Sequence, residues 1–128
     1  MYIYENPNPY NKVTDDCLVR TLAIIMDKSW EDAYDDLCYY GRLIYDMPNQ
    51  DATLSLYLRQ KGYQRYIIPN TCPACYTVID FCRDNPVGKY ILLTSNHAIP
   101  VIDGNYYDTS DSGENMPLIY WTKERVKK

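Results

Sequence analysis

Apolar residues recur every three or four positions in the segment that begins at Thr14. Leu18, Leu22 and Ile25 fall on one side of the expected helix, and further apolar residues flank them, so the helix is expected to be largely buried. Thr14 is the expected N-cap, and the pattern ends near 27–28.

Three further stretches carry the patterns of helices. Two of them open with a capping box, in which a hydroxyl side chain is followed three residues later by an acidic one: Ser29-Trp-Glu-Asp32 and Thr77-Val-Ile-Asp80. The third ends at Lys61-Gly62, a cation followed by the glycine that commonly terminates a helix. The expected bounds are Ser29 to Gly41, Asn49 or Asp51 to Gly62, and Thr77 to Asn85-Pro86.

The second half of the chain is rich in strand patterns. Apolar or β-branched runs are bounded by turn residues, and Asp103-Gly104 between two such runs is a strong hairpin signal. Together these elements predict a single α+β domain over 1–128, with N-terminal helices packed on a small antiparallel sheet. The expected strands are Tyr66–Ile68, Tyr90–Thr94, His97–Ile102, Asn105–Thr109 and Leu118–Thr122.

The predicted hairpin brings two polar side chains together. A two-residue turn at Asp103-Gly104 fixes the register, and counting outward places His97 and Asp108 diagonally on one face. Diagonal neighbours are within reach of a hydrogen bond between an imidazole and a carboxylate. Pro100 lacks an N–H, so a bulge there would shift the register by one residue and put Asp111 in place of Asp108.

The segment before the first helix is rich in proline and asparagine. Each residue before a proline in Asn6-Pro-Asn-Pro-Tyr10 is pushed out of the helical basin, so this segment is expected to run over the surface as an extended arm. With Thr14 as N-cap, Cys17 is the third residue of the helix. Its thiol would lie beside unpaired backbone N–H groups at the positive end of the helix dipole, and both favour the thiolate.

Cys17, His97 and Asp108 are the residue types of a catalytic triad. A thiolate nucleophile needs a proton acceptor, the imidazole needs its second ring nitrogen held by a carboxylate, and the developing oxyanion needs N–H donors. We expect Cys17 to attack, His97 to transfer the proton and Asp108 to orient the imidazole. The expected oxyanion donors are the Cys17 backbone N–H and the side-chain amide of Asn11.

The order of these residues resembles the papain-like cysteine peptidase superfamily, in which a cysteine opens an N-terminal helix and a histidine and a carboxylate follow on later strands. Asp16-Cys-Leu-Val-Arg20 and the stretch from His97 to Asp108 are similar to those of small bacterial and phage members. The resemblance implies hydrolysis of an amide, peptide or isopeptide bond through a thioester, with a peptide or protein substrate and no cofactor. The family usually has a glutamine ahead of the cysteine, whereas this lead-in offers asparagines.

Two other functions fit the same residues. A noncatalytic inhibitor or binding module would place an acidic, tyrosine-rich surface on a host protein, and 15 tyrosines against one phenylalanine agree with such a surface. An acyl transferase would keep the triad and pass the acyl group to an amine. Selective reactivity of Cys17 distinguishes the enzymes from the inhibitor.

Composition also limits which ligands the protein is expected to bind and in which compartment it is expected to work. With 13 basic and 17 acidic residues and a net charge of -4, the chain is not expected to bind nucleic acid or anionic membranes. No apolar run approaches the roughly 18 residues of a membrane span, and the N-terminus lacks the pattern of a secretory signal. Five cysteines, an odd number, agree with a reducing compartment, so a cytoplasmic protein is expected.

Cys72-Pro-Ala-Cys75 has the spacing of half a zinc site or of a redox pair. Because there is no second pair of this spacing and Cys82 is the only nearby third ligand, a loop with free thiols is favoured and no metal is expected. Asp16 and Arg20 are expected to form a helix cap and a local ion pair.

Overall fold

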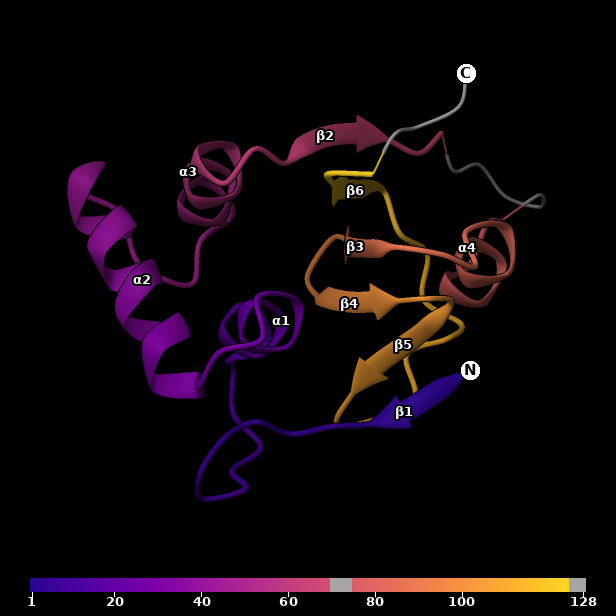
Figure 1. Ribbon diagram of the computed structural model, residues 1–128, viewed down its shortest axis with the longest axis horizontal. Coiled ribbons are helices and arrows are strands. Elements are labelled where there is room, and N and C mark those ends of the chain that lie inside the picture. The colour runs from indigo at the N-terminus through magenta and orange to yellow at the C-terminus, as the bar shows by residue number, and fades with distance from the viewer. Residues whose placement is uncertain (70–74, 125–128) are drawn as a thin grey trace.

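The computed structural model describes residues 1–69 and 75–124 of the chain. These residues form an α+β fold of four helices and six strands (Figure 1). The helices are α1 (Cys17–Ile25), α2 (Trp30–Leu43), α3 (Asp51–Gln60) and α4 (Val78–Asp84). The strands are β1 (Tyr2–Tyr4), β2 (Gln64–Ile67), β3 (Lys89–Leu93), β4 (Ala98–Ile102), β5 (Asn105–Asp108) and β6 (Ile119–Thr122).

The strands of the described residues form one open sheet in the order β1-β5-β4-β3-β6-β2. Neighbouring strands are antiparallel except β1 and β5, which are parallel. The sheet is therefore mixed, and it is larger than the small antiparallel sheet expected from the sequence. The unexpected strand is β1, because three residues ahead of a proline-rich segment carry too little pattern to indicate a strand.

The helices cover the two faces of the sheet unequally (Figure 1). Helices α1, α2 and α3 pack on one face, against Ile91 and Leu93 among others, while α4 packs on the other face, against Tyr90 and Leu92. Successive residues of β3 thus point into different apolar clusters. Burial on both faces explains why the β3 sequence is a continuous apolar run rather than an alternating one.

The hairpin of β4 and β5 has the predicted two-residue turn. Ile102 pairs with Asn105 across Asp103 and Gly104, whose φ angles of 51° and 77° lie in the left-handed region that a type I′ turn requires. The pairing of β4 with β5 stops before Pro100, which has no N–H to donate. The predicted register is confirmed, and it brings the start of β4 and the end of β5 to the same end of the sheet.

Helix α1 begins later than predicted. Its N-cap is Asp16 and its first residue is Cys17, so Thr14 is not the cap and Cys17 is not the third helical residue. The Asp16 N–H donates to the Thr14 carbonyl oxygen at 2.8 Å, which forms a turn ahead of the helix. The Asp16 side chain makes no capping hydrogen bond, and the first turn of α1 has no side-chain cap from this residue.

Two other helices start as predicted. The Ser29 hydroxyl accepts a hydrogen bond from the Asp32 N–H at 3.1 Å at the start of α2. At the start of α4 the Thr77 hydroxyl accepts from the Asp80 N–H at 3.2 Å, and Asp80 Oδ2 accepts from the Thr77 N–H at 2.9 Å. The cap of α3 is Gln50, which lies between the two residues considered from the sequence.

Gly41 lies inside α2 and does not end it, because the helix continues to Leu43. A Cβ atom at Gly41 would lie 2.7 Å from the Asp46 carbonyl oxygen. The Asp46 N–H donates to the Gly41 carbonyl oxygen at 2.8 Å, so the chain returns to this point of the helix directly after leaving it. The glycine is therefore explained by close backbone approach and not by helix termination.

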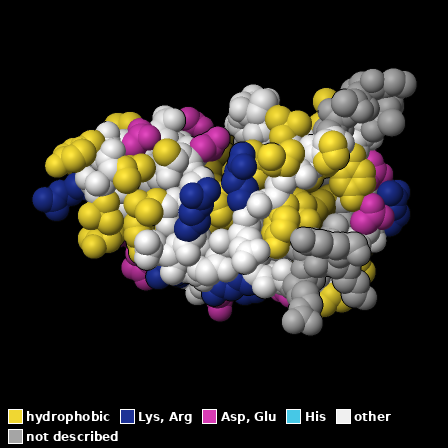
Figure 2. All heavy atoms as spheres, turned by 90° about the horizontal axis from the view of Figure 1, so that it is seen from above, with side chains coloured by type: hydrophobic (Ala, Val, Ile, Leu, Met, Phe, Trp, Pro, Cys, Tyr) yellow, Lys and Arg dark blue, Asp and Glu magenta, His cyan; other side chains and the backbone are white. Residues whose placement is uncertain are grey.

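The tyrosines divide between the core and the surface. Tyr57 and Tyr106 are buried, whereas Tyr10 and Tyr45 are 87% and 97% exposed. On the face seen from above, hydrophobic side chains lie in separate groups with Lys and Arg side chains between them (Figure 2). In residues 1–69 and 75–124, no helix has both the length and the apolar character that crossing a membrane requires.

Candidate active site

A cleft of about 270 Å³ lies where α1 begins. Its walls come from the start of α1, the start of α3 and the turn that joins β3 to β4, three segments that are far apart in the sequence. Cys17 and His97 both line this cleft. The lining residues are Asp15, Cys17, Leu18, Asn49, Gln50, Asp51, Leu93, Thr94, Ser95, Asn96, His97 and Ala98.

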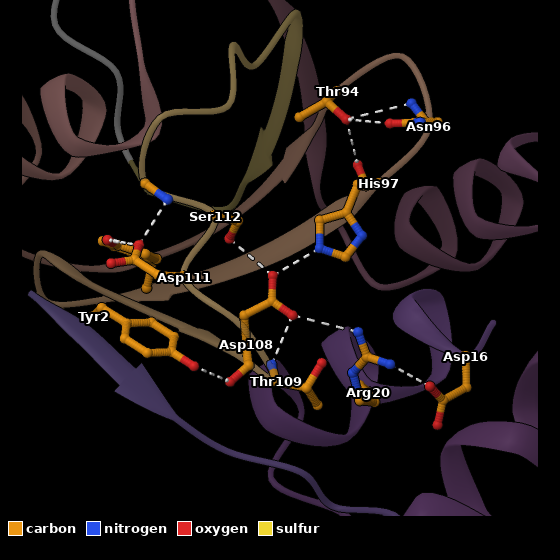
Figure 3. Close-up of polar contacts among 12 residues, drawn as sticks. Tyr2, Asp16, Arg20, Thr94, Asn96, His97, Asp108, Thr109, Asp111 and Ser112 are labelled. Atoms are coloured by element: carbon orange, nitrogen blue, oxygen red, sulfur yellow. Dashed lines mark hydrogen bonds and ion pairs between the residues drawn. The ribbon is translucent and has the colours of Figure 1, made fainter. Parts of the chain in front are cut away.

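His97 is held directly before β4 by the turn between β3 and β4. The Thr94 N–H donates to the His97 carbonyl oxygen at 2.9 Å and closes the turn. The imidazole Nε2 lies 2.7 Å from Asp108 Oδ2 (Figure 3). Because Nε2 is engaged with Asp108, Nδ1 is the ring nitrogen left to exchange a proton with Cys17.

Asp108 ends β5, and its residue surface is 3% exposed. Its Oδ2 contacts His97 and accepts a hydrogen bond from the Ser112 hydroxyl at 2.8 Å (Figure 3). Its Oδ1 accepts from the Thr109 N–H at 2.8 Å and lies 3.4 Å from Nη2 of Arg20. A buried carboxylate with partners on both oxygens keeps one orientation and stays ionised.

The contact between His97 and Asp108 changes the pKa of both groups. The hydrogen bond to Asp108, followed by the hydrogen-bonding interaction with Cys17, raises the pKa of His97 from its usual 6.5 to about 9, although burial opposes the change. Burial acts to raise the pKa of Asp108, but hydrogen bonds from His97 and Ser112 outweigh it and hold this pKa below its usual value. At neutral pH the pair is therefore an imidazolium beside a carboxylate.

Three cysteines in the described part of the chain are free, and their surroundings differ. Cys17 is half-buried, lines the cleft and interacts with His97. Cys82 is buried in α4, and burial raises its pKa above the usual value. Cys38 is half-buried in α2. Only Cys17 among these three has the chain's single histidine beside it.

Arg20 links the contact between His97 and Asp108 to the start of α1 (Figure 3). Its Nη1 pairs with Asp16 Oδ1 while its Nη2 faces Asp108, and Trp30 Nε1 donates to the other Asp16 oxygen at 2.9 Å. Asp16 is the N-cap residue of α1, as expected, but its side chain makes no capping hydrogen bond, because its carboxylate accepts from Arg20 and Trp30 instead. The ion pair expected with Arg20 is present, but it is part of a longer buried chain of charges that the spacing did not predict.

Asn11 is not brought into the cleft. Its φ is 54°, and its Oδ1 accepts hydrogen bonds from the Tyr4 hydroxyl at 3.3 Å and from Asn6 Nδ2 at 3.2 Å. Asn6 Nδ2 also donates to the Lys12 carbonyl oxygen at 3.0 Å. These contacts fold the asparagine-rich segment onto itself, so the predicted oxyanion donor is a loop residue away from Cys17.

Asp111 does not take the place of Asp108. Its Oδ1 accepts hydrogen bonds from the Tyr106 hydroxyl and, at 3.0 Å, from the Gly113 N–H. The neighbouring Ser112, which no sequence pattern indicated, is the residue of this loop whose side chain contacts the Asp108 carboxylate. Its only signal was its place in a run of polar residues shortly after β5.

Of the Cys72 and Cys75 pair, Cys72 lies outside the described residues. Cys75 is disulfide-bonded, so the expectation of a free thiol at this position is wrong. Within residues 1–69 and 75–124, no group of three or more His, Cys, Asp and Glu side chains is placed to hold a metal ion.

Comparisons with protein-family models, with curated proteins and with solved structures find no match to this chain. The contacts of Cys17, His97 and Asp108 are therefore the basis for assigning a function.

Proposed function

We propose that the protein is a cysteine hydrolase of papain-like type that cleaves an amide, peptide or isopeptide bond. The observation that carries the proposal is the position of the His97 imidazole, which contacts the Asp108 carboxylate at 2.7 Å and lines the same cleft as Cys17. The packing of α1 against β4 supports the papain-like assignment, since one element begins with the cysteine and the other directly follows the histidine.

In the first half of the proposed reaction, Cys17 Sγ attacks the substrate carbonyl carbon as a thiolate. A C–S bond forms and the carbonyl oxygen becomes an oxyanion. The His97 imidazolium gives its proton to the leaving nitrogen, the C–N bond breaks, and an amine departs from a thioester on Cys17. The raised pKa of His97 supports this step, because the imidazolium is already formed at neutral pH.

In the second half, neutral His97 takes a proton from water, and the water oxygen attacks the thioester carbon. The C–S bond then breaks, a carboxylic acid leaves, and the thiolate and imidazolium are restored. Asp108 stays ionised throughout and keeps Nε2 of the ring directed away from the thiol.

The oxyanion requires hydrogen-bond donors close to Cys17. One proposed donor is the Cys17 backbone N–H, because α1 lacks a capping hydrogen bond from Asp16. The side-chain amides that line the cleft, those of Asn49, Gln50 and Asn96, are the candidates for a second donor in place of Asn11.

The charge of the cleft indicates which side chains a substrate can have next to the cleaved bond. The carboxylates of Asp15 and Asp51 line it together with amide and hydroxyl side chains, and the lining residues include no Lys or Arg. A peptide or protein segment without an acidic side chain next to the cleaved bond is therefore the expected substrate.

A generic acyl donor tests this proposal before the natural substrate is identified. With p-nitrophenyl acetate we expect a burst of p-nitrophenol, an acetyl group on Cys17 detected by peptide mass mapping, and slow release of acetate. Cys17→Ala should lose the burst, and Cys82→Ala should keep it. Acetyl that leaves Cys17 only after an amine is added would indicate an acyl transferase instead, and absence of any burst or adduct at Cys17 would favour the noncatalytic binding module.

A further inference from the structure

The chain of buried charges that ends at His97 begins at Asp16, the N-cap residue of α1, and continues through Arg20. Asp16 and Arg20 are 5% and 6% exposed, and Arg20 contacts carboxylates on both sides, Asp16 through Nη1 and Asp108 through Nη2. Arg20 also approaches the Thr14 carbonyl oxygen, at 3.5 Å. An arginine is rarely buried to this extent unless its charge is paired.

We propose that Arg20 acts on the candidate active site through Asp108: its charge limits how strongly His97 holds its proton. Arg20 is separated from His97 by the Asp108 carboxylate, whose Oδ1 faces Arg20 and whose Oδ2 faces the imidazole. This inference rests on the function proposed for Cys17 and His97.

The contribution of Arg20 is its charge rather than the orientation of Asp108. The Ser112 hydroxyl and the Thr109 N–H, both at 2.8 Å, already fix the two carboxylate oxygens, and the contact with Arg20 is longer at 3.4 Å. A cation at that distance in a buried site still lowers the negative potential at the neighbouring imidazole.

The proposed reaction needs this limit. His97 must donate a proton in the first half and accept one in the second, and a group does both best when its pKa lies near the working pH. A buried Asp108 without a second cation would stabilise the imidazolium further and leave less neutral imidazole for the attack of water. Asp16, in turn, reduces the effect of Arg20, because it neutralises part of the guanidinium charge.

Other charged and titratable groups lie around His97. Asp15 and Asp51 of the cleft do not pair with Arg20 and are exposed, so solvent screens their charges more than those of the buried chain. Cys17 at the start of α1, Asp15 ahead of it and Asp51 on α3 line the cleft with His97, and Asp108 on β5 contacts it. Arg20, Asp16 and the Tyr2 hydroxyl of β1, which donates to the Asp108 carbonyl oxygen at 3.2 Å, lie beyond Asp108.

The test is an NMR titration of His97 in the full chain without a histidine tag, because His97 is the only histidine and its imidazole signals need no further assignment. Arg20→Met should raise the titration midpoint by roughly half to one pH unit. Arg20→Lys, which keeps a cation, should stay near the wild-type midpoint. Asp16→Asn should move the midpoint the other way, because it leaves the Arg20 charge less neutralised while an amide oxygen can still accept from Trp30.

Arg83→Met is the matched control. Arg83 is 67% exposed by its side chain and pairs with Asp80 on α4, so its removal should leave His97 unchanged. An unchanged or lowered midpoint in Arg20→Met would overturn the proposal, as would a raised midpoint in Asp16→Asn. If Arg20→Met does not fold, the midpoint of Asp16→Asn decides the question.

The titration does not depend on turnover. A shift of the expected sign in a protein without hydrolase activity would support the charge effect and contradict the proposed function. In an active enzyme, both limbs of the pH profile of kcat/KM should move to higher pH in Arg20→Met, a change that loss of stability alone would not produce.

Discussion

Helices α1 and α4 begin in opposite ways, and the difference separates a structural helix start from a candidate functional one. At α4, Thr77 and Asp80 satisfy each other's backbone N–H groups in a complete capping box. At α1, Asp16 is the N-cap residue but its carboxylate accepts from Arg20 and Trp30, so it makes no capping hydrogen bond. Asp16 is of a residue type suited to capping, but its carboxylate binds buried side chains instead. The backbone N–H groups beside Cys17 therefore lack a cap from Asp16.

The cysteines on these two helices also differ, in their burial and in their neighbours. Cys82 of α4 is buried among apolar side chains, and burial raises its pKa. Cys17 opens onto the cleft beside His97. One thiol is a small apolar group of the core, and the other is the nucleophile of the proposed function.

The largest expected effect comes from replacing each of the two cysteines in turn. Cys17→Ala should lower turnover of an ester or amide substrate by at least roughly 10³-fold, since no other group can form the thioester. Cys82→Ala should leave turnover within about threefold and instead lower the free energy of unfolding by about 1 kcal/mol, because it removes a buried sulfur. Equal losses of activity in the two variants would remove the distinction between the helices.

The next effect concerns the two aspartates near the end of β5. Asp108→Asn should reduce turnover by roughly 10²-fold or more, less than Cys17→Ala, because an amide still accepts one hydrogen bond but no longer stabilises the imidazolium. Asp111→Asn should change turnover by less than about threefold, since Asp111 contacts Tyr106 and Gly113 rather than His97. The reverse ranking would show that Asp111, and not Asp108, orients the imidazole.

The contact between His97 and Asp108 should also appear in the dependence of stability on pH. The pKa of His97 is raised in the folded state, from the usual 6.5 to about 9, so the protonated ring stabilises the fold fully below about pH 6.5, and this contribution is lost as pH rises toward 9. His97→Gln should therefore cost on the order of 2 kcal/mol at the lower pH and little above pH 9. Urea denaturation of both proteins at several pH values checks this; a difference that grows with pH would contradict it.

The smallest effect is expected at the cap of α4. Thr77→Ala should lower the free energy of unfolding by about 1 kcal/mol, because the Asp80 N–H loses its acceptor. Turnover and the alkylation of Cys17 should not change. Loss of Cys17 reactivity in this variant would show that the two helix starts are coupled and are not separate structural and functional cases.

Local patterns predicted the parts of this fold that depend on neighbours in the sequence. The caps at Ser29 and Thr77, the turn at Asp103 and Gly104 and the register of the hairpin all follow from residues a few positions apart. The contact of His97 with Asp108 belongs to this group, because a two-residue turn determines which side chains face each other.

Contacts between distant segments could not be predicted in this way. Nothing near Arg20 in the sequence indicates that it reaches Asp108, and an i,i+4 spacing with Asp16 suggests only a local pair. The prediction that Asn11 donates to the oxyanion failed for a related reason, since short-range hydrogen bonds among asparagines keep its loop away from the cleft. The walls of the cleft come from three separate segments, so its amide side chains had no common sequence signal.

The most direct measurement is the rate of alkylation of each cysteine by iodoacetamide as a function of pH, with peptide mapping of the products. We predict that Cys17 is alkylated well before Cys82 at about pH 6, and that His97→Ala removes most of that advantage. Matching pH profiles for the two thiols, or a Cys17 rate that is indifferent to His97→Ala, would contradict the claim that Cys17 is an activated nucleophile.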